Sequence, residues 1–222
     1  MSSHPKATSS RILILDFGAQ YSQLIARRVR EAHVYCELHP AHMDLAAIRA
    51  FAPTGIILSG GPSSVLDADA PDMDSGVFAL GVPILGICYG LQLVVQKLGG
   101  RVESADDREY GRASLKLECD DPLFEGLSRD SEHVVWMSHG DRVLALPAGM
   151  RRIATSGGSP FAAVRAEATA DRAPIWGVQF HPEVVHTEGG RRMLENFVLR
   201  ICGCEPRSAS NFTMSRLSSK PA

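Results

Sequence analysis

Hydrophobic residues recur in the first half of the chain with two different periods. Short apolar runs, typical of strands buried on both faces, occupy residues 12–15, 55–58 and 83–87, and a further strand is expected at residues 34–38. Apolar side chains at helical spacing predict helices at residues 21–32, 45–51 and 89–98, with another candidate at residues 74–80. Strands that alternate with helices predict right-handed crossovers and a parallel sheet.

The second half of the chain has a different pattern. Residues 114–118 alternate between apolar and polar side chains, which predicts a strand with one face in water. Further strands are expected at residues 134–137, 152–154, 161–164 and 175–180, followed by a helix at residues 189–201. We therefore predict an α/β fold: an open, mostly parallel central sheet flanked by helices, with an additional antiparallel or mixed β portion in the second half.

The length of 222 residues suits one large domain, and polar segments at both ends set its limits. We place the domain at residues 11–204. Residues 1–10 are polar and predict a disordered N-terminal tail. Residues 205–222 are polar and rich in serine, which predicts either the remnant of a linker or a disordered tail.

Composition and charge narrow the classes of partner. The chain is 45% hydrophobic with a formal net charge of −2, so nothing favours binding to nucleic acid or to a membrane surface. No apolar run reaches the roughly 18 residues of a membrane span, and no signal peptide is recognisable, so we expect a cytoplasmic protein. Its five cysteines are then expected to be free thiols. Cys202 and Cys204 lack the neighbouring ligands of a zinc site, so no metal is expected.

Cys88 lies in the sequence Gly-Ile-Cys-Tyr-Gly of residues 86–90, between a predicted buried strand and a predicted helix. A nucleophile flanked by glycines at a strand-to-helix turn is typical of a nucleophile elbow. The N–H groups and the dipole of the following helix favour the reactive thiolate. A lone cysteine is more often a buried structural residue, and the turn alone leaves the two interpretations about equal.

His181 and Glu183 directly follow the last predicted strand. A thiol nucleophile needs a base, and the base needs a third group to orient its ring. Residues i and i+2 of an extended segment point to the same side, so Glu183 can reach His181. By itself the pattern is usually a solvated turn, but beside a cysteine turn at the end of another strand it predicts a Cys-His-Glu triad.

Residues 59–62, Ser-Gly-Gly-Pro, also follow a buried strand. Backbone N–H groups of a Gly-Gly turn can stabilise the oxyanion of a tetrahedral intermediate, with the N–H of Tyr89 as a second donor. The alternative is a simple tight turn, which is common for this composition. A phosphate loop is excluded because the G-x-x-x-x-G-K-[ST] pattern is absent.

Three motifs in this order resemble the class I, or triad, glutamine amidotransferase family, and the resemblance runs from about residue 11 to residue 204. The motifs are residues 59–62, residues 86–92 and residues 177–183, the last reading Gly-Val-Gln-Phe-His-Pro-Glu. Four further segments are most similar to the amidotransferase domains of GMP synthetases: residues 15–21, 108–111, 136–141 and 184–187.

The resemblance implies hydrolysis of L-glutamine to glutamate and ammonia through a γ-glutamyl thioester. It implies that Cys88 is the nucleophile, that His181 transfers protons and that Glu183 orients His181. The implied oxyanion donors are the N–H groups of Gly61 and Tyr89. The implied glutamine-binding residues are Gln92, Ser138, Gly140 and Asp141, with Ser63 nearby, and His186 is implied to face a partner domain.

Simpler interpretations of three of these positions stay open. Asp141 suits a turn, His139 suits a role in folding alone, and His186 suits a solvated surface histidine.

The chain lacks the ATP-pyrophosphatase and dimerisation domains of a complete GMP synthetase. The resemblance therefore implies no cofactor in this chain, because ATP and Mg belong to the absent synthetase domain. The implied partner is a GMP synthetase ATP-pyrophosphatase domain or subunit, with this chain either a free-standing glutaminase subunit or a domain of a fused enzyme. The alternatives are the amidotransferase component of anthranilate, aminodeoxychorismate or carbamoyl phosphate synthesis, or a catalytically silent regulatory interaction domain.

Overall fold

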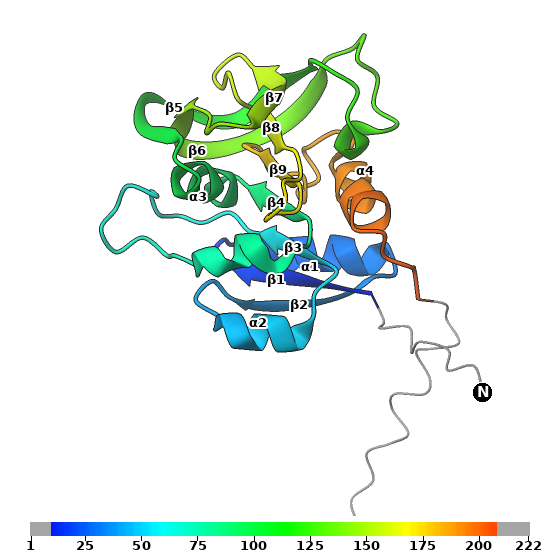
Figure 1. Ribbon diagram of the computed structural model, residues 1–222. Helices are drawn as coiled ribbons and strands as arrows, with labels where there is room; N and C mark the ends of the chain where they lie inside the picture. Colours follow the sequence, from blue (N-terminus) through cyan, green and yellow to red (C-terminus); the bar gives the residue numbers. More distant parts are fainter. Residues whose placement is uncertain (1–9, 208–222) are drawn as a thin grey trace, which may run out of the picture.

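The structure is a computed structural model that describes residues 10–207, and for residues 105–108 the backbone only (Figure 1). The segments predicted as tails, residues 1–10 and 205–222, lie outside this part except for residue 10 and residues 205–207. The strands are β1 (Arg11–Asp16), β2 (Tyr35–Pro40), β3 (Gly55–Leu58), β4 (Ile84–Ile87), β5 (Arg101–Leu117), β6 (His133–Ala145), β7 (Met150–Ser156), β8 (Ala163–Ala166) and β9 (Ile175–Val178). The helices are α1 (Ser22–Glu31), α2 (Leu45–Phe51), α3 (Tyr89–Lys97) and α4 (Gly190–Glu195), with 3₁₀ turns η1 (Ser75–Leu80) and η2 (Pro122–Phe124) and a π-helical segment η3 (Asn196–Ile201).

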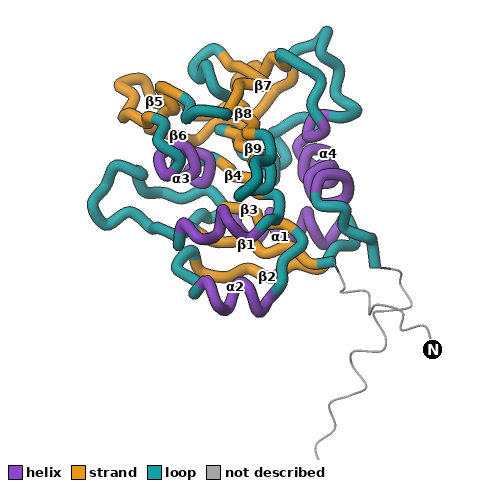
Figure 2. The backbone as a smooth tube through the Cα atoms, viewed as in Figure 1, coloured by secondary structure: helices purple, strands orange, loops and turns teal. Residues whose placement is uncertain are grey.

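All of these strands belong to one sheet, in the order β2-β1-β3-β4-β9-β8-β7-β5-β6. From β2 to β9 the neighbours are parallel, and from β9 to β6 they are antiparallel. Figure 2 shows the parallel strands β1–β4 in the lower part of the molecule and the antiparallel strands β5–β8 in the upper part. The expected parallel sheet with an antiparallel portion is confirmed, and β9 is the strand that joins the two halves.

Helices cover both faces of the parallel half. Ile12 and Ile14 of β1 pack in one apolar cluster with the buried residues of α1, α4 and η3. Leu13 and Leu15 of the same strand pack in a second cluster with α2, η1 and α3. Burial of each such side chain contributes about 1.5–3 kcal/mol, which explains why this strand is apolar at successive positions.

The antiparallel half differs most from the sequence-based expectation. β5 and β6 are far longer than the short strands predicted at residues 114–118 and 134–137, and they pair with each other along most of their length. Alternate residues of β6 are buried and partly exposed, so the polar residues and glycine of positions 138–142 belong to the strand although they lie beyond the apolar run at residues 134–137.

Two predicted helices also take a different form. The helix predicted at residues 74–80 is the short 3₁₀ segment η1 (Ser75–Leu80), which Asp74 caps by accepting the Gly76 N–H and which Gly81 follows with φ 73°. The predicted helix at residues 189–201 begins as α4 and continues as the π-helical η3. There the buried Asn196 amide donates to two carbonyls, Leu123 O at 3.0 Å and Glu125 O at 2.9 Å.

The carboxyl ends of the parallel strands meet at one edge of the sheet. Asp16 ends β1, Ser59 follows β3, Cys88 follows β4 and Gln179 follows β9. Open α/β sheets place their binding sites at this edge. Within residues 10–207, no helix has the length and apolar character needed to span a membrane.

Candidate active site

Cys88 joins β4 to α3 with φ 50° and ψ −103°, a conformation that residues other than glycine rarely adopt. Such strain costs roughly 1–3 kcal/mol and persists only where the surroundings enforce it. Two backbone hydrogen bonds do so here: Cys88 N–H donates to Val178 O at 2.7 Å, and Gly90 N–H donates to Ser59 O at 3.1 Å. A Cβ atom at Gly90 would lie 2.6 Å from Leu58 O, so only glycine permits this approach of α3 to β3.

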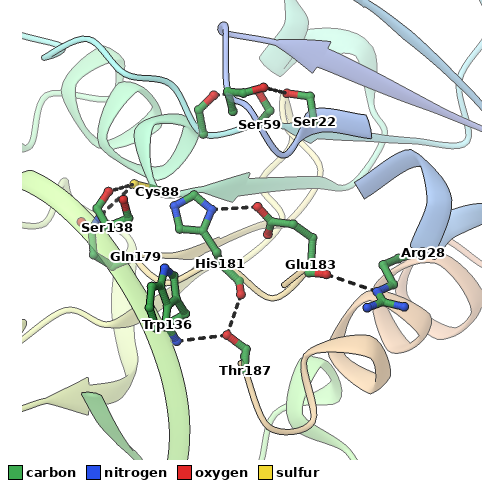
Figure 3. Close-up of polar contacts among 12 residues, drawn as sticks. Ser22, Arg28, Ser59, Cys88, Trp136, Ser138, Gln179, His181, Glu183 and Thr187 are labelled. Atoms are coloured by element: carbon green, nitrogen blue, oxygen red, sulfur yellow. Dashed lines mark hydrogen bonds and ion pairs between the residues drawn. The ribbon is translucent and has the colours of Figure 1, made fainter. Parts of the chain in front are cut away.

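His181 and Glu183 form a buried pair beside Cys88. His181 Nδ1 lies 2.7 Å from Glu183 Oε1, and the two residues are 5% and 1% exposed. Because a carboxylate only accepts hydrogen bonds, we assign the proton to Nδ1, which leaves Nε2 for Cys88. Figure 3 shows the ring of His181 between Cys88 and Glu183.

The electrostatics of His181 reflect both neighbours. Burial lowers the pKa of His181, but hydrogen bonds to Cys88 and to Glu183 outweigh burial and raise this pKa to about 10. A raised pKa means that the imidazolium is stabilised relative to the neutral ring. The site therefore stabilises the proton on His181 after that proton has left the Cys88 thiol.

The segment that carries His181 and Glu183 is tied to its surroundings at several points (Figure 3). Thr187 Oγ1 donates to His181 O at 2.6 Å and accepts the Trp136 N–H at 3.0 Å. His181 N–H in turn donates to Trp136 O at 3.0 Å. Arg28 Nε donates to Glu183 O at 3.2 Å from α1. These contacts hold the two side chains in place from β6 on one side and α1 on the other.

The Gly-Gly turn packs directly against the pair formed by Cys88 and His181. A Cβ atom at Gly60 would lie 3.0 Å from His181 Cε1 and 3.8 Å from Cys88 Cβ. One at Gly61 would lie 2.8 Å from Phe17 O. Both positions of the turn therefore favour glycine, because a Cβ atom at either one would be too close to neighbouring atoms.

A cavity of ≈ 540 Å³ opens at Cys88. Its wall comes from the loop after β3, from α3, and from facing residues of β5 and β6. The structure brings together here every residue predicted to bind the substrate, and also one predicted oxyanion donor: Ser63, Gln92, Ser138, Gly140, Asp141 and Gly61. Tyr89, the other predicted donor, follows Cys88 directly and begins α3, whose first N–H groups have no acceptor within the helix.

Asp141 lies within β6, so its interpretation as a turn residue is wrong. Its backbone carbonyl accepts Gln92 Nε2 at 2.8 Å. Its carboxylate accepts a short hydrogen bond from Ser64 Oγ, which links the loop after β3 to the antiparallel half. Ser64, and not the neighbouring Ser63, therefore makes the cross-link that the sequence reasoning missed.

His139 and His186 occupy different environments. His139 is buried in the cavity wall, with Nδ1 2.9 Å from Asp141 O and Nε2 3.2 Å from Glu109 Oε2. His186 is exposed, and its ring centroid lies 4.9 Å from that of Trp136, outside the cavity lining. The structure thus does not bring His186 to the thiol, and its predicted role towards a partner stays a prediction.

Gln179 is a second residue that the sequence reasoning missed. It is fully buried, and its Nε2 lies 3.6 Å from Cys88 Sγ. In the sequence, residue 179 lies two positions before His181, the spacing at which side chains of an extended segment share one side, although the structure forms bends at residues 179–180 and a turn at residues 182–183. Tyr89, in contrast, takes no side-chain part in the cavity: its hydroxyl donates to Pro71 O, and burial, with Asp72 and Asp67, raises its pKa to about 12.

Other parts of the molecule offer less chemistry. Two further cavities lie around residues 116–130, and neither is lined by Cys88, His181 or Glu183. In the part of the chain that the structure describes, no group of three or more His, Cys, Asp and Glu side chains could hold a metal ion.

Known proteins resemble this chain in sequence and in fold. The chain is 54% identical over 202 residues to "GMP synthase [glutamine-hydrolyzing]" of Chromobacterium violaceum, covering 88% of this chain and 38% of that protein. It is 49% identical over 195 residues to the protein of the same name from Brachyspira hyodysenteriae, covering 88% of this chain and 37% of that one. The chain thus spans less than two fifths of the length of these curated relatives.

Solved structures agree with this relationship. A protein from Thermoplasma acidophilum, described as one subunit of a GMP synthase, superposes with a TM-score of 0.75 at 28% identity, covering 95% of this chain and all of that one. A glutamine amidotransferase from Thermotoga maritima superposes at 0.64 with 16% identity, over 87% of this chain and 98% of that one, which shows the shared fold alone. The family model described as "Glutamine amidotransferase class-I" matches residues 13–201. The chain therefore belongs to the class I glutamine amidotransferase family.

Proposed function

We propose that this chain hydrolyses the side-chain amide of L-glutamine and supplies the ammonia to a GMP synthetase domain or subunit. The observation that carries the proposal is the strained Cys88, which contacts the buried pair of His181 and Glu183 at a cavity large enough for an amino acid. No metal or cofactor is needed for the steps proposed below.

In the first step the thiol proton of Cys88 passes to His181 Nε2, and the resulting thiolate Sγ attacks the amide carbonyl carbon. The C–N bond then breaks, and His181 returns this proton to the departing nitrogen, which leaves as ammonia. Glu183, bonded to Nδ1 at 2.7 Å, stabilises the imidazolium between these two events. Water next attacks the γ-glutamyl thioester with His181 as base, and glutamate and the thiol are restored.

The oxyanion of the tetrahedral intermediates needs donors on the side of Cys88 away from the imidazole. We assign this role to the N–H groups of Gly61 and Tyr89. Gly61 lines the cavity together with Cys88, and Tyr89 opens α3. The helix dipole at this end of α3 favours the same negative charge.

The far end of the cavity is the natural place for the α-amino and α-carboxylate groups of glutamine. Ser138, Gly140 and Asp141 line the cavity from β6, and Ser63 lines it from the loop after β3. Gln92 donates both amide hydrogens of Nε2 to protein acceptors, so its carbonyl oxygen is the group that can accept a hydrogen bond from a ligand.

The proposed acceptor of the ammonia rests on the names and lengths of the relatives. The relatives from Chromobacterium violaceum and Brachyspira hyodysenteriae are both called glutamine-hydrolysing GMP synthases. The chain matches only 37–38% of their length. The remainder of such a protein, or a separate subunit, would carry out ATP-dependent amination of XMP. Ammonia must reach that centre without being protonated in solvent, so we expect a docked partner and weak glutaminase activity without it.

The test is glutamate release from glutamine by the purified chain, with Cys88→Ser as the control. A second tube contains a GMP synthetase ATP-pyrophosphatase domain with XMP and ATP. We expect release that depends on Cys88 and that rises when the partner and its substrates are present.

Two other outcomes would change the assignment. Release that needs Cys88 but ignores the partner and XMP would support the glutaminase and remove GMP synthesis as the acceptor reaction. Absence of release in both tubes, with Cys88 also resistant to a thiol-reactive glutamine analogue, would contradict the glutaminase itself and favour a silent interaction domain.

A further inference from the structure

Gln179 is a buried polar side chain that the Cys-His-Glu chemistry does not use. It is 0% exposed, and its backbone N–H donates to Ala162 O at 2.8 Å. Its side chain reaches back to the nucleophile, with Nε2 3.6 Å from Cys88 Sγ (Figure 3). A buried amide that points at a reactive sulfur is either a packing residue or part of the chemistry.

The orientation of this amide follows from its neighbours. Asp141 O is a carbonyl and only accepts, so Gln92 must turn its nitrogen towards it, at 2.8 Å. The second hydrogen on Gln92 Nε2 then points to Gln179, which must present its oxygen, at 3.3 Å. With Oε1 used in this way, the N–H donor of Gln179 is the group that faces the sulfur.

The far end of this hydrogen-bonded chain is anchored in the antiparallel half. Asp141 O also accepts His139 Nδ1 at 2.9 Å, and His139 Nε2 lies 3.2 Å from Glu109 Oε2. Glu109 and His139 are direct partners across β5 and β6. The amide of Gln179 is thus held by Gln92, which is 87 positions away in sequence, and through Gln92 by the paired strands β5 and β6.

The sulfur of Cys88 therefore meets one donor and one acceptor besides His181. The thiol can donate to Ser138 O at 3.6 Å, but a thiolate has no proton to donate, and the carbonyl then repels it. Gln179 Nε2 has the opposite preference, because an N–H donor bonds more strongly to an anion than to a neutral sulfur. When Cys88 is a thiolate, the hydrogen bond from the Gln179 amide therefore offsets the repulsion by the Ser138 carbonyl.

We propose that Gln179 is a catalytic residue that stabilises the Cys88 thiolate by donating a hydrogen bond to its sulfur. No proton passes through Gln179, since the amide keeps both hydrogens throughout. The donor acts when the thiolate attacks and again when it leaves the thioester. The inference rests on the proposed function for its role in turnover, but its effect on the thiol is independent of glutamine.

The test uses Gln179→Met, which keeps the volume and removes the donor, and Gln179→Glu, which keeps the shape and places a carboxylate against the sulfur. Alkylation of Cys88 by iodoacetamide is measured as a function of pH. Mass spectrometry of the peptide that contains Cys88 distinguishes its alkylation from that of the other four cysteines. We expect the midpoint of the alkylation profile to rise by about one pH unit in Gln179→Met, and further in Gln179→Glu.

The matched control is Gln96→Met, the same substitution at an amide on α3 that donates to Val65 O and makes no contact with Cys88. It should leave the alkylation profile unchanged. In glutaminase assays Gln179→Met should lower kcat roughly tenfold, with a smaller change in KM.

Unchanged alkylation midpoints in both Gln179 variants, with thermal melting curves that show them folded, would overturn the proposal and leave Gln179 a packing residue. A wild-type chain without glutaminase activity would contradict the proposed function only. The alkylation profiles would still decide the role of Gln179 in that case.

Discussion

The two halves of the sheet contribute to the site in different ways. The parallel half supplies strained or tightly packed backbone: the turn at Cys88 and the Gly60–Gly61 turn, where added carbon atoms would meet neighbours at 3.0 Å or less. The antiparallel half supplies side chains and carbonyls of β6 that line the cavity and are joined by hydrogen bonds. A tightly packed backbone tolerates almost no change, whereas single hydrogen bonds can be removed one at a time.

The largest effect is expected at the nucleophile of the parallel half. Cys88→Ser should lower glutaminase activity by about a thousandfold or more, because the hydroxyl is far less nucleophilic than the thiolate. The fold should survive, since the substitution is nearly isosteric. Glutamate release measures the activity, and a thermal melting curve measures whether the variant is folded. Substantial activity in this variant would show that another residue is the nucleophile.

The next largest effect is expected where the two halves join. Glu183→Gln keeps the size of the side chain but removes the carboxylate that bonds His181 Nδ1 at 2.7 Å. The ring loses its fixed tautomer and the imidazolium loses its counter-charge, so kcat should fall by roughly a hundredfold or more. A decrease in kcat of less than about threefold would show that Glu183 does not orient the base.

The same pair predicts how stability depends on pH. The folded-state pKa of His181 is raised from 6.5 to about 10. The protonated ring therefore contributes stability that is fully present below about pH 6.5 and is lost as the pH rises through about 10. We expect the melting temperature of the wild type to fall over this range more steeply than that of Cys88→Ser or Glu183→Gln, each of which removes one group that raises this pKa. Parallel pH profiles for the three proteins would contradict this coupling.

Gly60→Ala tests the packing of the parallel half at smaller scale. The added methyl would lie 3.0 Å from His181 Cε1, so the ring must shift by a few tenths of an ångström and kcat should fall roughly tenfold. Gly157→Ala is the control in the antiparallel half, because no atom lies within 4 Å of the added methyl there. Equal activity of the two variants would show that the turn does not constrain the imidazole.

The smallest effect is expected in the hydrogen bonds of the antiparallel half. Ser64→Ala removes the hydroxyl that links the loop after β3 to the Asp141 carboxylate. We expect KM for glutamine to rise about threefold to tenfold with little change in kcat, as for a contact that acts equally in ground and transition states. A variant that instead lowers kcat at constant KM would place this link in the chemistry rather than in binding.

Much of the parallel half could be predicted because its signals are local. The strand at residues 84–87, the turn at Cys88 and the helix after it follow one another in sequence, so apolar periodicity and two glycines suffice to identify them. His181 and Glu183 are likewise two residues apart, so their contact could be predicted, although a turn at residues 182–183 and not an extended segment brings them together.

The antiparallel half was less predictable because its contacts join distant segments. Ser64 meets the Asp141 carboxylate across 77 residues, and Gln92 meets the Asp141 carbonyl across 49. No periodicity in a single sequence encodes such a pair. The long strand β5 was missed over most of its length for a related reason: its pairing with β6, not its own apolar pattern, makes it a strand.

The sequence by itself thus determined the fold class, the family and the order of the chemical groups along the chain, because these depend on periodicity and on residues close together. Only the tertiary structure decided that Ser64 rather than Ser63 bonds to Asp141, and that the Gln179 amide faces the Cys88 sulfur. The physical reason is that hydrogen bonds act over about 3 Å, and only strand pairing and helix packing bring residues so far apart in sequence to that distance.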